Sequence, residues 1–91
     1  MKNENKEKGE VFRILRQLFG FHELKAFGEH IGISYVTLSN VENGRTVASM
    51  KTVNAYSKAL GIPLSDLCKI IQENSSLDGI RNIVKNYLSE L

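Results

Sequence analysis

Residues 24–45, LKAFGEHIGISYVTLSNVENGR, form the stretch that decides the fold. Apolar residues at helical spacing predict one short helix over 23–31 and another over 35–43. The turn between them is Gly32-Ile33-Ser34, in which the glycine suits the left-handed conformation that ends a helix and the serine suits the cap of the next one. Two short helices joined in this way predict a helix-turn-helix, with the second helix set across the first.

The helical pattern continues on both sides of this motif. Segments with one apolar face at helical spacing predict further helices over 11–19, 50–60, 64–72 and 77–91. No segment shows the sustained alternation of a strand, so we expect an all-α fold. It consists of a five-helix domain that contains the helix-turn-helix, and of a C-terminal amphipathic helix. The expected division is a disordered polar tail over 1–8, the domain over 9–72 and the C-terminal helix over 73–91.

Length and composition exclude several classes of protein. A chain of 91 residues has room for one ordinary domain and little room for a deep catalytic cleft. The single cysteine, Cys68, excludes an intrachain disulfide framework and a cysteine-based zinc site, and we expect it to be a small buried hydrophobe. His22 and His30 have no further ligands at suitable spacing. Because no acid, base or nucleophile arrangement is found, we expect neither an enzyme, nor a metal, nor a cofactor.

Charge and hydropathy give the expected location. The net charge of +2 is too small to indicate a partner by itself. No apolar run approaches the roughly 18–20 residues that span a bilayer. Residues 2–8 are polar and do not resemble the core of a signal peptide. We therefore expect a cytoplasmic protein without a membrane partner.

The second helix of the motif has an uncharged outer face. This face contains Tyr35, Val36, Ser39, Asn40 and Asn43. Asparagine pairs with adenine, serine bonds to either type of base, and valine contacts a thymine methyl group. A solvated helix surface is the alternative interpretation. Next to a matching turn, however, this composition favours a helix that reads base edges of double-stranded DNA.

The same residues carry a resemblance to a known family. Residues 32–67 resemble the lambdoid-phage-repressor type of helix-turn-helix, the XRE family of transcriptional regulators, and the similarity extends over roughly 11–71. It rests on Gly28, Gly32, Ser34 and the run Glu42-Asn43-Gly44-Arg45, followed by the helix exit ALGIPL over 59–64. Together these elements are a strong signal, whereas each alone is weak.

The resemblance implies a role for each matching residue. The residues implied to face bases are Tyr35, Val36, Ser39 and Asn40. The residues implied to hold phosphates are Ser34, Asn43, Arg45 and Thr46. Lys51, near the start of the following helix, is either a further phosphate contact or a solvated lysine. Glu42 is implied to turn inward and pair with an arginine on the first helix, for which Arg16 is the best candidate.

One departure from the family concerns the start of the second helix. The family usually places a phosphate-binding glutamine where this chain has Leu24, and this chain has one residue more than usual before Phe27. We therefore expect this helix to begin differently, with Glu23 or Lys25 near the DNA backbone.

The C-terminal helix has a wide apolar face that allows two interpretations. It either caps the core of its own chain or forms a dimer seam, and different residues can serve each purpose. For the seam we select Ile80, Ile83, Val84, Tyr87 and Leu88. A symmetric dimer suits a palindromic site.

The sequence thus predicts a sequence-specific DNA-binding transcriptional regulator, a repressor that binds a palindromic operator as a homodimer. The alternative is an antitoxin-type interaction module, which binds a partner protein through the C-terminal helix and regulates its own operon.

Overall fold

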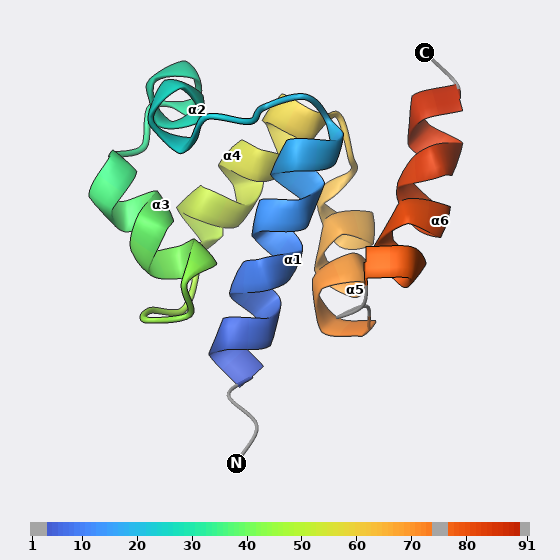
Figure 1. Cartoon of the computed structure of the whole chain (residues 1–91), viewed down its shortest axis with the longest axis horizontal. Coiled ribbons are helices and arrows are strands. Elements are labelled where there is room, and N and C mark those ends of the chain that lie inside the picture. Colours follow the sequence, from blue (N-terminus) through green and yellow to red (C-terminus); the bar gives the residue numbers. More distant parts are fainter. Residues whose placement is uncertain (1–3, 74–76, 90–91) are drawn as a thin grey trace.

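The computed structural model describes residues 4–73 and 77–89, with side chains over 5–73 and 77–85. Every regular element in these ranges is a helix, which confirms the expected all-α class (Figure 1). In chain order the helices are α1 (Glu4–Leu18), α2 (Leu24–Ile31), α3 (Tyr35–Glu42), α4 (Met50–Leu60), α5 (Leu64–Glu73) and α6 (Leu77–Ser89).

Helix α1 is the centre of the fold. It packs against α3 on one side and against α5 and α6 on the other (Figure 1). The core between these helices is apolar, and its fully buried side chains include Leu15, Leu38, Tyr56, Leu67 and Ile80. Burying a large apolar side chain stabilises a fold by about 1.5–3 kcal/mol. The helix-turn-helix is therefore attached to the core through α1 rather than standing apart from it.

The turn between α2 and α3 forms as its residue types predict. Gly32 has a φ of 74°, in the left-handed region, and the next amide, Ile33 N, donates to the Gly28 carbonyl at 3.0 Å. The Ser34 hydroxyl then accepts a hydrogen bond from Thr37 N at 3.2 Å and caps α3. These contacts fix the direction in which α3 leaves α2.

Gly28 lies where the two helices of the motif approach each other. A Cβ atom on Gly28 would lie 2.6 Å from the Ile33 carbonyl oxygen and 3.2 Å from Leu38 Cδ1. The first of these neighbours is backbone and cannot rotate away. The sequence resemblance placed a small residue here, and the crossing distance explains why it is needed.

The N-terminal segment differs from the prediction. Residues 4–8 belong to α1, so their interpretation as a disordered tail is wrong, and residues 1–3 lie outside the described part of the chain. The reason is a tertiary contact. Gly9 is buried, and a Cβ atom there would overlap the Val41 carbonyl oxygen. A Cβ atom on Gly44 would likewise overlap the backbone of Lys6. The polar first turns of α1 are held against the end of α3.

Helix α6 covers the core of its own chain. Ile80 and Val84 are 0% and 1% exposed, and α6 packs against α1. The predicted dimer seam therefore does not extend to these two residues, because their i, i+4 face is already occupied by α1. Ile83 is half-buried against the same core. The side chains of Tyr87 and Leu88 lie outside the described part of the structure.

No helix in the described part of the chain is both long enough and apolar enough to cross a bilayer.

The crossing at Gly28 yields a first prediction. Gly28→Ala is expected to lower the free energy of unfolding by about 1–3 kcal/mol through overpacking, although alanine alone favours a helix by about 1 kcal/mol over glycine. Urea denaturation measures the difference, with the neighbouring exposed residue changed in Glu29→Ala as the control. A Gly28→Ala protein as stable as the control would contradict the close crossing.

Candidate nucleic-acid interface

Helix α3 presents the predicted base-reading residues on the outside of the molecule. Tyr35 and Val36 are 52% and 65% exposed, and Ser39 and Asn40 are half-buried beside them. The opposite face holds Leu38, which is fully buried. The structure thus brings the four predicted residues together on one accessible surface.

A buried ion pair holds the C-terminal end of α3. Arg16 Nε donates to Glu42 Oε2 at 3.0 Å and Arg16 Nη2 donates to Glu42 Oε1 at 3.0 Å, a two-pronged pairing of the kind that the resemblance implies. The two side chains are 4% and 2% exposed. Arg16 Nη1 also donates to the Phe21 carbonyl at 2.6 Å. This pair connects α1, α3 and the loop before α2.

Tyr56 on α4 completes the hydrogen bonds of Glu42. Its hydroxyl donates to Glu42 Oε2 at 2.5 Å. Burial raises the pKa of Tyr56 well above its usual range, and the negative charge of Glu42 raises it further. The phenol therefore keeps its proton and remains a donor. Helices α1, α3 and α4 meet at this one carboxylate.

Arg13, which sequence reasoning missed, is a second cation at the end of α3. Its Nη2 atom donates to Asn43 Oδ1 at 2.8 Å and to the Glu42 carbonyl at 3.3 Å, and its Nε lies 3.8 Å from Glu42 Oε1. The last turn of α3 has no basic residue of its own. The C-terminus of a helix favours nearby cations, and here α1 supplies two of them, Arg13 and Arg16. The available signal was the spacing of Arg13 from Arg16, which places both on one side of α1.

The residues predicted to hold phosphates lie just before α3, at its end, in the loop after it and in the first turn of α4. Ser34, Asn43, Arg45, Thr46 and Lys51 are all exposed. The backbone amides of Arg45 and Thr46 donate to the Asn40 carbonyl at 2.8 and 3.3 Å, which folds this loop against α3. The Ser34 hydroxyl caps α3, so it serves the helix as well as any ligand.

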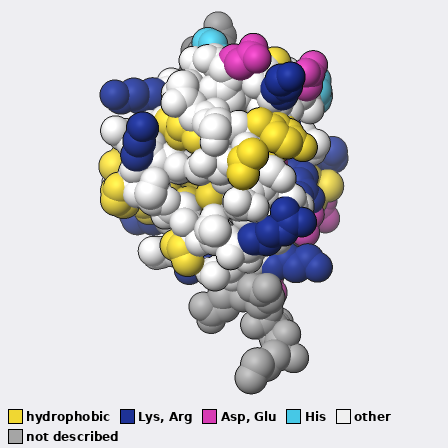
Figure 2. Space-filling model, turned by 90° about the vertical axis from the view of Figure 1, so that its left-hand side faces the viewer, with side chains coloured by type: hydrophobic (Ala, Val, Ile, Leu, Met, Phe, Trp, Pro, Cys, Tyr) yellow, Lys and Arg dark blue, Asp and Glu magenta, His cyan; other side chains and the backbone are white. Residues whose placement is uncertain are grey.

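The charge distribution suits a reading face with a basic rim. Figure 2 views the molecule from the side of α2 and α3. The middle of this face is uncharged, Lys and Arg side chains lie around it, and Asp and Glu side chains lie at its upper edge. Helix α3 itself contains no Lys or Arg. Cations at the rim can contact phosphates while the uncharged helix reaches bases.

The sequence differs from the family at the start of α2, where Leu24 replaces the usual glutamine. The helix begins at Leu24, and Glu23 occupies the cap position without a side-chain hydrogen bond. Leu24 packs against the core and has no polar atom for a phosphate. Lys25 is exposed in the first turn of the helix.

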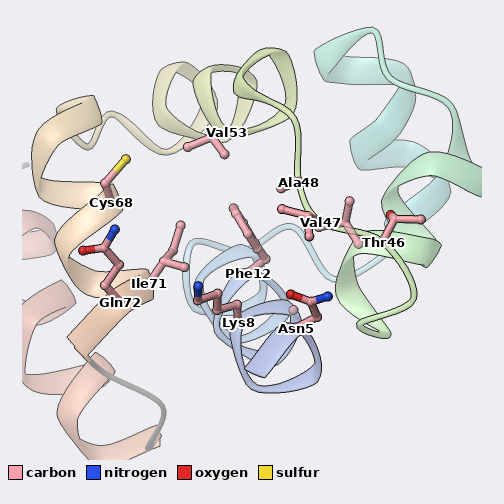
Figure 3. Close-up of a pocket in the computed structure, with 12 residues that line it drawn as sticks. Asn5, Lys8, Phe12, Thr46, Val47, Ala48, Val53, Cys68, Ile71 and Gln72 are labelled. Carbon is pink, nitrogen blue, oxygen red and sulfur yellow. The ribbon is translucent and has the colours of Figure 1, made fainter. Parts of the chain in front are cut away.

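A pocket of about 190 Å³ lies behind the loop after α3 (Figure 3). Phe12, Val47, Val53 and Ile71 give it an apolar lining. Cys68 also lines it and is half-buried, so it is less enclosed than the sequence suggested. Among the described residues no group of His, Cys, Asp or Glu is arranged to hold a metal ion.

A comparison with protein families decides the class of the chain. The family model described as helix-turn-helix matches residues 12–67, which include all of α2, α3 and α4. The chain belongs to the helix-turn-helix family of the XRE type. Searches of curated proteins and of solved structures found no match. This helix-turn-helix protein is a DNA-binding transcriptional regulator, and its α6 lies beyond the matched segment.

The ion pair yields a second prediction. Arg16→Met keeps an apolar stem but leaves the buried Glu42 charge without its partner, so the free energy of unfolding is expected to fall by about 3–5 kcal/mol. Arg81→Met, which removes an exposed arginine on α6, is the control and is expected to change stability by less than about 0.5 kcal/mol. Chemical denaturation of both variants checks the result. Equal stability of the two would show that the pair is dispensable.

Tyr56 yields a third prediction. Tyr56→Phe removes one hydrogen bond to a charged group and is expected to cost about 1.5–3 kcal/mol at pH 7. Above about pH 10 the unfolded tyrosine loses its proton, whereas the folded one, with its raised pKa, keeps it. The stability of the unmodified protein should therefore decline faster with rising pH than that of Tyr56→Phe. Parallel pH profiles would refute this.

Proposed function

We propose that this regulator is a repressor that binds a palindromic operator as a homodimer and acts by occupying that site. The observation that carries the proposal is the uncharged, exposed face of α3, which α1 and α4 hold in place through Glu42. A helix fixed in this way can present hydrogen-bonding groups in a major groove without rearrangement.

Each residue of this face has a proposed role at the base edges. The Asn40 amide is suited to hydrogen-bond N6 and N7 of adenine, and the Val36 side chain is suited to contact the methyl group of thymine. Tyr35, more than half exposed, stands beside them at the start of α3. Arg45, Thr46 and Lys51 would contact the phosphates on either side. Phosphate contacts set affinity and register, whereas the α3 face sets the choice of sequence.

The dimer follows from the size of the reading face. One α3 helix reads only a few base pairs, too few to select one site among the many in a genome. Two copies related by a two-fold axis, with half-sites about 34–36 Å apart, double the sequence that is read. For the dimer seam we retain Ile83, together with Tyr87 and Leu88, because Ile80 and Val84 are buried in the core of their own chain.

Selection of bound sequences from random DNA, at a stated salt concentration, tests this function. The expected result is a single inverted repeat and, by mass measurement, two protein chains on each duplex. One chain per duplex would refute the dimer, and the absence of any enriched motif would refute sequence-specific binding. A complex that requires a second, different protein would support the antitoxin-type alternative.

The roles within the interface give a fourth prediction. Asn40→Ala is expected to weaken binding to the selected site by about 1–3 kcal/mol and to relax the choice at one base position. Lys51→Ala is the contrasting variant, since losing a phosphate contact weakens binding to all sequences alike and lowers the salt dependence by about one unit of slope. Dissociation constants on the selected site and its single-base variants separate the two. An equal loss on every sequence for Asn40→Ala would contradict base reading.

A further inference from the structure

A chain of side-chain hydrogen bonds runs from α1 to the exposed face of α3. Arg13 Nη1 donates to Glu10 Oε1 at 3.3 Å, and Arg13 Nη2 donates to Asn43 Oδ1 at 2.8 Å. Asn43 Nδ2 in turn donates to Ser39 Oγ at 3.2 Å. The chain ends on Ser39, one of the residues proposed to read bases.

The chemistry of Arg13 fixes the direction of every bond in this chain. A guanidinium carries only donors, so the Asn43 atom that faces it must be the carbonyl oxygen. The amide nitrogen of Asn43 is then turned toward Ser39, whose hydroxyl oxygen has to accept. Within the described residues, Ser39 Oγ makes no other side-chain hydrogen bond. Its proton is therefore left for a ligand.

We propose that Arg13 is a positioning residue for DNA recognition, which acts through Asn43 to make the Ser39 hydroxyl a hydrogen-bond donor toward the bases. This inference rests on the proposed function. In the major groove the acceptors are purine N7, guanine O6 and thymine O4, and the donors are the amino groups of adenine and cytosine. Accepting from Asn43 also polarises the hydroxyl and strengthens its own donation. Ser39 therefore selects a base that presents an acceptor.

Reversing the polarity of residue 43 should reverse this selection. Aspartate has the shape of asparagine, but both of its oxygens accept. In Asn43→Asp one oxygen still pairs with Arg13, while the other requires the Ser39 hydroxyl to donate inward. The hydroxyl would then offer only lone pairs to the DNA, and a base with an amino group would become the better partner.

The experiment compares base preference rather than affinity alone, and gives the fifth prediction. Selection with Ser39→Ala first identifies the base pair whose choice depends on the hydroxyl. Dissociation constants are then measured for the four base pairs at that position, with the unmodified protein and with Asn43→Asp. The unmodified protein should prefer guanine or thymine, which present only acceptors in the major groove, over cytosine, which presents only a donor, by roughly tenfold. Asn43→Asp should bind all sites more weakly, because of its added negative charge, and should shift the preference from guanine or thymine toward cytosine.

Two controls separate polarity from charge and from folding. Asn43→Asp in the Ser39→Ala background adds the same charge without the hydroxyl and should leave the base preference unchanged. Arg13→Met frees the amide of Asn43 to rotate and should flatten the preference. Denaturation curves show whether each variant is folded under the binding conditions.

The outcomes distinguish this inference from the function on which it rests. An Asn43→Asp protein that weakens equally on all four base pairs would overturn the role of Arg13 and Asn43, while sequence-specific binding would stand. The same holds if Ser39→Ala relaxes no position. Failure of the unmodified protein to select any sequence would overturn the proposed function itself.

Discussion

The orientation of the whole interface depends on one buried carboxylate. Glu42 accepts from Arg16 on α1 and from Tyr56 on α4, and it is the last residue of α3, the helix whose exposed face we propose reads the DNA bases. A helix as short as α3 is marginal by itself in water. Leu38 and Val41, which are 0% and 3% exposed, hold it against the core. The satisfied carboxylate restricts its rotation further, because another rotation would strand a buried charge.

This arrangement also explains how a weakly basic protein can be a DNA reader. Two arginines of α1, Arg13 and Arg16, contact the C-terminal end of α3. The exposed face of α3 carries no charged residue, and Lys, Arg, Asp and Glu side chains lie around it (Figure 2). The net charge of +2 is small, which suits selection of a site better than coating of DNA.

Local chemistry made much of the fold predictable from sequence. Gly32, Ser34, Ser49 and Gly61 mark the ends of helices, and the structure places helix caps at each of them. Such signals act between neighbouring residues, so they can be read without knowledge of the fold. The exposed side of α3 was predictable for the same reason, since Leu38 and Val41 define its buried side by helical spacing.

What could not be predicted depends on contacts between distant segments. The first turns of α1 are polar and resemble a tail, and only the approach of Gly9 and Lys6 to the end of α3 makes them part of the fold. The apolar stripe of α6 was visible, but its pattern does not state whether α1 or a second copy covers it. Arg13 and Asn43 lie 30 positions apart, and polar pairs at that separation leave no periodic signal. The candidate site was therefore predictable as a surface, whereas the contacts that orient it were not.

We propose that DNA binds to the face of α3 while α1 and α4 hold this face in place. Backbone amide chemical shifts, recorded while the protein is titrated with its selected duplex, test this location of the binding site. The largest changes are expected within residues 34–46 and at the start of α4, with the signals of the α6 residues that pack on α1 nearly unmoved. Changes concentrated on α6 or around the pocket behind the loop, with α3 unaffected, would contradict it.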